Sequence, residues 1–141
     1  MNGPRIAWLP DGRRLHMNHG PIDLIVEAFG AGEERRTAYA QAAARFRAIL
    51  DELVAELPEL RRPSAPGWPR AFAGPTARRM EAACVPLAET FITPMAAVAG
   101  SVADEMLAAL IAGRDLDRAY VNDGGDIAIH LAPGRSMRLA I

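Results

Sequence analysis

Apolar residues recur along this chain with two periods, one typical of helices and one typical of strands. From residue 33 to residue 57 they step by three and four positions, which predicts one long helix with a single apolar stripe. Elsewhere they alternate with polar residues, as in half-buried strands. This alternation predicts strands at residues 5–10, 15–17, 22–26, 120–121 and 127–131. The pattern therefore predicts an α+β fold, in which helices pack on a mainly antiparallel sheet.

A second helix is predicted over residues 93–112, and it is apolar almost throughout. Its opening Thr-Pro pair suits an N-cap and a first helical residue, and Gly113 suits the position after its end. Gly100 and Asp104 are one turn apart, so a carboxylate stands beside a position that has no side chain. The sequence leaves open whether Gly100 serves a ligand or only a close contact with a strand. Because Asp104 and Glu105 would together cost about 5 kcal/mol inside a membrane, a core helix is expected.

A glycine-rich turn joins the last two predicted strands. Residues 122–126 read Asn-Asp-Gly-Gly-Asp between two alternating apolar runs, a strong short-range signal for a hairpin. Two alternatives stay open for this turn. It needs these residues only for its backbone, or it offers bare N–H groups to a phosphate or a flat ring and carboxylates to a ribose hydroxyl or a cation. His19, beside the chain break at Gly20-Pro21, is a further candidate for a ligand contact.

Two strings of residues resemble a known signature. Ala99–Asp104 (AGSVAD), followed further along by Val121–Ile127 (VNDGGDI), is similar to the paired signature of the ApbE-like superfamily. The characterised members of that superfamily are FAD:protein FMN transferases. His19–Leu24 and the run from Phe91 to Glu105 are similar to a cytoplasmic branch whose members are uncharacterised. The resemblance implies an ApbE-like fold, with this chain as the N-terminal portion of a longer protein.

The resemblance also implies a ligand and a set of contact residues. The ligand would be FAD or FMN, a nucleotide-type small molecule. The residues implied to contact it are Asn122, Gly124, Gly125, Asp126, Gly100, Asp104 and His19. The implied reaction is a magnesium-assisted transfer that splits the pyrophosphate of FAD and places FMN on a hydroxyl of an acceptor protein. The resemblance assigns no catalytic residue within this chain.

Two departures from the signature point away from catalysis. The superfamily's Lys and Tyr are replaced here by Ala99 and Ser101, and its magnesium-binding segment is not found up to Ile141. Magnesium is therefore expected only together with a missing C-terminal segment, and no metal ligand is assigned. Two functions remain open, an FMN transferase and a non-catalytic module that binds a flavin or is purely structural.

Composition narrows the partners and the compartment. A net charge of −1 and 6% aromatic residues argue against a nucleic-acid groove. The chain has no lysine, which excludes Schiff-base and P-loop lysine chemistry. Its single cysteine, Cys84, has apolar neighbours and is expected to be an inert buried thiol in a reducing compartment. Since the N-terminus has no apolar signal core, a cytoplasmic protein without a membrane partner is expected.

Residues 1–141 are expected to form a single domain with a proline-rich loop at residues 61–69. Trp68 in this loop is expected to pack on the core, and the alternative is a lid that stacks on a flavin. Residues 136–141 have the pattern of a strand with a free edge. Because an unpaired edge attracts further strands, a homo-oligomer is expected.

Overall fold

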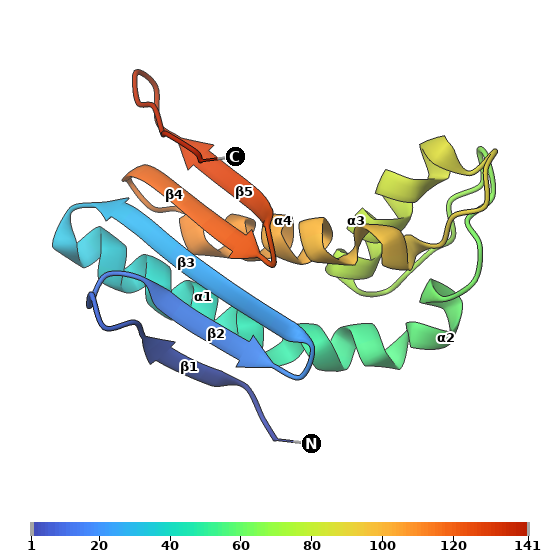
Figure 1. The fold of residues 1–141 in the computed structure, drawn as a ribbon, viewed down its shortest axis with the longest axis horizontal. Helices are drawn as coiled ribbons and strands as arrows, with labels where there is room; N and C mark the ends of the chain where they lie inside the picture. The colour runs from blue at the N-terminus through green and yellow to red at the C-terminus, as the bar shows by residue number, and fades with distance from the viewer. Residues whose placement is uncertain (1, 141) are drawn as a thin grey trace.

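A five-stranded antiparallel sheet forms the centre of the molecule (Figure 1). The structure is a computed structural model, and it describes residues 2–140. The strands lie in the sheet in the same order as in the chain. They are β1 (Arg5–Trp8), β2 (Leu15–His19), β3 (Ile22–Gly30), β4 (Leu116–Asp123) and β5 (Asp126–Leu131). The predicted α+β fold with an antiparallel sheet is confirmed.

The helices all lie in the chain between β3 and β4, and the two longest of them cover one face of the sheet (Figure 1). They are α1 (Gly32–Ala55), α2 (Leu57–Leu60), α3 (Pro75–Cys84) and α4 (Val98–Ile111), with 3-10 turns η1 (Val85–Leu87) and η2 (Pro94–Ala97). α1 and α4 lie side by side, and α3 packs beside α4. Because β3 and β4 are neighbours in the sheet, the helical segment starts and ends on adjacent strands. Within residues 2–140 the other face of the sheet carries no helix.

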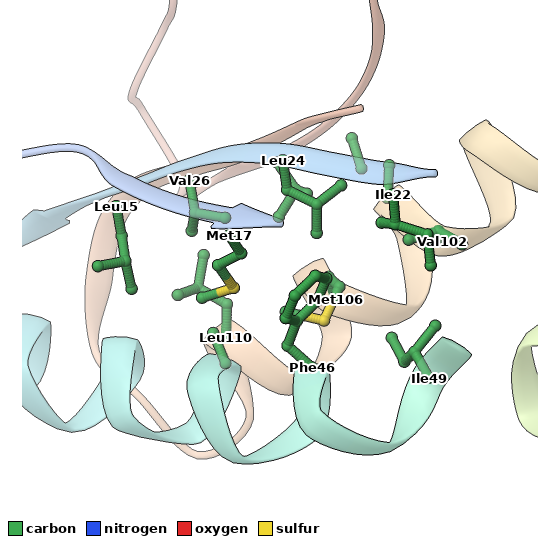
Figure 2. Close-up of a cluster of buried hydrophobic side chains, with 14 of the residues drawn as sticks. Leu15, Met17, Ile22, Leu24, Val26, Phe46, Ile49, Val102, Met106 and Leu110 are labelled. Carbon is green, nitrogen blue, oxygen red and sulfur yellow. The ribbon is translucent and has the colours of Figure 1, made fainter. Parts of the chain in front are cut away.

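The hydrophobic core fills the space between the sheet and the pair α1 and α4 (Figure 2). Every second residue of the central strands points into it, as the alternating pattern predicts. The fully buried side chains that meet there include Met17, Leu24, Val26, Phe46, Ile49, Val102, Met106 and Leu110. Each such side chain contributes about 1.5–3 kcal/mol to folding. This shared layer holds the helices on the sheet.

The ends of the two long helices follow the predicted breaks, with one difference in detail. α1 ends at Ala55, and Pro58 lies in the first turn of α2, so the proline does end the long helix. The second predicted helix begins as a 3-10 turn, and among the described residues the side chain of Thr93 makes no capping hydrogen bond. Gly113 has a φ of 66°, as expected for the residue that follows a helix end.

The proline-rich loop after α2 is held by a buried carboxylate of α3, Glu81. It accepts hydrogen bonds from Arg70 Nε (2.7 Å), the Arg70 backbone N–H (2.8 Å) and Ser64 Oγ (2.6 Å). The Arg70 guanidinium foremost, and Ser64 with it, lower the pKa of Glu81 to about 2. Trp68 lies between these two anchors and is 78% exposed, so the prediction that it packs on the core is wrong. The anchors fix the ends of the loop and leave its tip in solvent.

Residues 136–140 do not form the predicted strand, and Ile141 lies outside the described residues. A turn at Ala132, whose carbonyl accepts the N–H of Arg135 (3.0 Å), directs the chain onto the helix-free face of the sheet. There Arg118 of β4 donates a hydrogen bond to the Ser136 carbonyl (3.3 Å). Because the segment lies on a face and not along an edge, it has no strand to pair with.

One helical segment, Pro94–Ile111, has the length and the mean hydropathy (1.4) to cross a membrane. In this domain, however, Glu105 within it forms ion pairs with Arg45 of α1 (3.2 Å) and Arg79 of α3 (2.8 Å). The same segment supplies Val102 and Met106 to the core. These contacts are those of a core helix in a small globular domain, as predicted.

Candidate functional site

Three of the segments that carry predicted site residues meet the same end of the sheet. β3 starts and β4 ends there, since Leu24 lies opposite Asp123 in the antiparallel pair. The β2–β3 turn after His19 and the β4–β5 turn are therefore at one end (Figure 1). α4 runs behind β4 and β5, and its N-terminal part projects past the β4–β5 turn. The predicted residues thus share one end of the molecule, although they do not all share one surface.

The β4–β5 turn is fully explained as a piece of backbone. Gly124 (φ 60°) and Gly125 (φ 106°) both have positive φ, as two-residue hairpins of the favoured type require at both positions. Asn122 Oδ1 accepts the N–H of Gly125 (2.9 Å) and closes the turn. A Cβ built on either glycine meets no atom within 4 Å. The turn therefore projects into open space, and its glycines need no ligand to account for them.

A group of carboxylates surrounds this turn. Asp123 and Asp126 lie opposite each other as the last pair of the hairpin. Partial burial foremost, and then the charges of Asp126 and Asp23, raise the pKa of Asp123 to about 6. Asp23 itself accepts hydrogen bonds from His16 Nε2 (2.6 Å) and Asn18 Nδ2 (3.1 Å). Within residues 2–140 neither Asp123 nor Asp126 has such a partner, and of these two Asp123 is the one that is partly buried.

Gly100 presents a bare stretch of helix on α4. A Cβ at this position meets no atom within 4 Å, so the alternative that the glycine permits a close contact with a strand is wrong. Its φ is not positive either. A glycine inside a helix costs about 1 kcal/mol relative to alanine. Neither packing nor backbone conformation explains the glycine at this position. The exposed side chain of Asp104 follows one helical turn later.

His19 is buried on the side of the sheet that the helices cover. It is 5% exposed, and its ring contacts Phe46 of α1 edge-on, with 6.5 Å between ring centroids. Its Nδ1 is buried and has no hydrogen-bond partner within the described part of the chain. The structure therefore places His19 in the core, separate from the surface at Gly100, Gly124 and Gly125.

Cavities lie near these segments, and sequence analysis did not find the two described next. A cavity of about 250 Å³ lies between the β2–β3 turn, the end of α1 and the start of α4, and includes Pro21, Leu53, Met95 and Val98. A wider one, of about 580 Å³, lies on the helix-free face between β4 and residues 136–140. Arg118, Arg138, Tyr120, Phe29 and Asn122 line it. Both cavities are formed by segments that are distant in the chain, so no local sequence pattern predicts them.

The described residues do not fit a magnesium site. Within residues 2–140, no group of three or more His, Cys, Asp or Glu side chains is placed to hold a metal ion. The acidic side chains around the β4–β5 turn come as a pair with a third carboxylate nearby, and that third one is already bonded to His16. No metal-dependent step is derived for this site.

Comparison with known proteins corrects the family expected from the sequence. The family model that matches the chain, over residues 6–141, is the one described as AbpE bacteria. It is not the model of an ApbE-like FMN transferase family. No curated protein and no solved structure matches the chain. The expected membership of the ApbE-like superfamily is therefore wrong. One of the two strings behind it, at residues 121–127, has a local explanation in the needs of a tight turn. Since the match covers almost the whole sequence, the protein belongs to the family described as AbpE bacteria.

Proposed function

We propose that this protein is a non-catalytic binding module for a flat heteroaromatic ligand of the flavin class. The ligand lies on the first half of α4, beside the β4–β5 turn. The observation that carries this proposal is Gly100, a helix glycine that faces open space. A residue without a side chain lets a ring approach the helix backbone closely. A ligand supplies the reason for this glycine that packing does not.

The carboxyl group of Asp123 supports a ligand with both donors and acceptors along one edge. With a pKa of about 6, this group is poised near neutral pH between its two forms. The ionised form accepts a hydrogen bond from a ring N–H, and the protonated form donates one to a ring carbonyl. The pyrimidine edge of a flavin has both kinds of group. A ligand that donates a hydrogen bond to this carboxylate would also supply the partner that it lacks within residues 2–140.

The charge around the turn favours the uncharged part of a flavin over its phosphate. Three carboxylates lie near this turn, those of Asp23, Asp123 and Asp126. No arginine pairs with Asp123 within residues 2–140. A phosphate placed at Gly124 and Gly125 would face these carboxylates. FMN or FAD would therefore bind with its phosphates directed away from the turn, and riboflavin should bind at least as tightly as either.

A reducing compartment accords with this function. Cys84 is the one cysteine, it is buried, and its Sγ donates a hydrogen bond to the Thr93 carbonyl (3.4 Å). Burial raises the pKa of this thiol, which keeps it unreactive. We place the protein in the cytoplasm on this ground.

Since the described residues do not fit a magnesium site, the proposed function does not include transfer of FMN to an acceptor protein.

The test is a fluorescence titration of riboflavin, FMN and FAD with the wild type and with Gly100→Ala. The variant should be more stable by about 0.5–1 kcal/mol, because alanine favours a helix. It should also bind flavin at least about tenfold more weakly, because the methyl group occupies the contact surface. Ala108→Gly, at an exposed position of the same helix, is the matched control, with lower stability and unchanged affinity.

Three results separate this site from the alternatives. A Gly100→Ala variant that is stabilised and binds as well as the wild type would remove the ligand from α4. If Arg118→Ala abolishes binding in that case, the flavin occupies the cavity of about 580 Å³ on the helix-free face. Absence of binding to the wild type for all three flavins would refute the proposed function itself.

A further inference from the structure

The two edges of the sheet differ in how they are protected. β1 has four residues, carries Arg5, and is flanked by Pro4 and Pro10. Short length, charge and proline are the usual means by which an edge avoids pairing. β5 has six residues and contains neither proline nor a basic residue other than His130. Within residues 2–140 no strand lies on the outer side of β5. It is the edge that remains open to another strand.

We propose that β5 pairs with β5 of a second copy of this chain, antiparallel and about a two-fold axis. A two-fold interface joins the same surface on both copies, so the edge must be complementary to itself. An antiparallel strand pair meets this condition if residues placed symmetrically about the centre fit one another. One continuous sheet then crosses the interface, and the outward backbone groups along the paired part of β5 gain partners.

The sequence of β5 is self-complementary in one register, centred on Ala128. In this register Asp126 lies opposite His130 of the second copy, and Ile127 lies opposite Ile129 of the second copy. Directly opposite residues point to the same face of the sheet, so the acid meets the imidazole and the isoleucines meet each other. Symmetry makes both contacts twice. In a register shifted by one residue, Asp126 would lie opposite a residue whose side chain points to the other face of the sheet. Because directly opposite residues point to the same face, this register is excluded.

Exposure on the helix-free face agrees with this pairing. The edge strand β5 carries two exposed apolar side chains on this face, Ile127 and Leu131, each 42% exposed. Their face carries no helix in the described chain. Pairing with a second β5 brings Ile127 against apolar side chains and removes part of this surface from water. The Asp126–His130 match favours a second copy as the occupant, because a second β5 carries both residues in the order that this register requires.

The first test is sedimentation of the wild type over a concentration series. The wild type should be a dimer, and Ile129→Lys should shift it toward a monomer, with dimerisation weakened at least about tenfold. Ile25→Lys is the matched control, because Ile25 points to the same face from the central strand β3 and does not lie at the edge. Its dimer should persist. A wild type that stays monomeric at every concentration, or a dimer disrupted equally by Ile25→Lys, would overturn the pairing.

The second test fixes the register by oxidative cross-linking of cysteine variants. The double variant Ile127→Cys and Ile129→Cys should form covalent dimers, because the two positions face each other across the axis. Ile129→Cys alone should not, since it faces Ile127. Rapid cross-linking of the single variant would place Ile129 on the axis and overturn the register. Gly100→Ala should remain a dimer, so failure of the flavin proposal and failure of this one are separate results.

Discussion

Two acidic side chains, Glu81 and Asp123, show opposite uses of a partly or wholly buried carboxylate. Glu81 receives hydrogen bonds from Ser64 and Arg70, and its pKa falls to about 2. Asp123 has other carboxylates as neighbours, and its pKa rises to about 6. The first group is fully compensated and holds a loop in place. The second lowers the stability of the fold when it is ionised.

The comparison teaches how a structural site differs from a candidate binding site. The Glu81 carboxylate already has its partners in Ser64 and Arg70, so it needs no ligand. Around Asp123 and Gly100 the chain keeps an unpaired acid and an open helix glycine, and each of them costs stability. Strain of this kind is expected where a protein serves a ligand. The following predictions test this contrast, from the largest expected effect to the smallest.

Glu81→Ala should have the largest effect. It leaves Ser64 Oγ without its acceptor, and among the described residues the Arg70 guanidinium keeps only its hydrogen bonds to Glu59 and to the Arg62 carbonyl. Loss of one partner of a buried ion pair costs about 3–5 kcal/mol. Urea unfolding measures this loss. Glu89→Ala, at an exposed position soon after α3, should change stability by less than about 0.5 kcal/mol. Equal effects of the two variants would contradict the role of Glu81 as the anchor.

Acid should remove most of the same stabilisation. A carboxylate with a lowered pKa stabilises the fold above its unfolded value, and this contribution is lost as the pH falls. For Glu81 the loss should occur between pH 4.5 and about 2, and should reach about 3 kcal/mol. Unfolding at a series of pH values, compared with Glu81→Gln, measures it. A Glu81→Gln profile as steep as that of the wild type would assign the acid loss to other groups.

Asp123→Asn should act in the opposite direction. With a raised pKa, the folded state holds its proton more tightly than the unfolded state, so stability falls as the pH rises from 3.8 to about 6. Removing the charge should therefore stabilise the protein at pH 7 by about 1–2 kcal/mol, after allowance for partial exposure. Below pH 3.8 the variant and the wild type should be alike. Asp104→Asn, on the exposed surface of α4, is the control, and it should change stability at pH 7 by less than about 0.5 kcal/mol.

Asn122→Ala should have the smallest effect. It removes the acceptor for the Gly125 N–H, a hydrogen bond worth about 0.5–1.5 kcal/mol at an exposed turn. Thermal unfolding measures the loss. An unchanged melting temperature would mean that the two glycines alone hold the turn.

Periodicity predicted most of the fold because its elements are set by local pattern. The alternation around Leu15–Met17 and Ile22–Val26 marks strands whose one face is buried, and the stripe from Tyr39 to Leu53 marks the buried side of α1. Asp-Gly at the β4–β5 turn predicted the hairpin for the same reason. These features depend on neighbours within a few residues.

The rest depends on residues that are distant in the chain. The raised pKa of Asp123 comes partly from Asp23, which β3 brings alongside β4. His19 was a candidate for a ligand contact because it lies beside a chain break, but the burial of a residue at a strand end is decided by the helix that covers it, here through Phe46. Residues 136–140 have a strand pattern without a strand to pair with. Pattern alone cannot supply such partners.

The connection between β3 and β4 also has a consequence for the order of folding. β1, β2 and β3 form a local meander, β4 and β5 form a local hairpin, and only the β3–β4 pair joins segments on the two sides of the helices. Closing so long a loop is entropically unfavourable until α1 and α4 have packed. The β3–β4 seam should therefore be the slow step, and hydrogen exchange during refolding should protect its amides after those of either local unit.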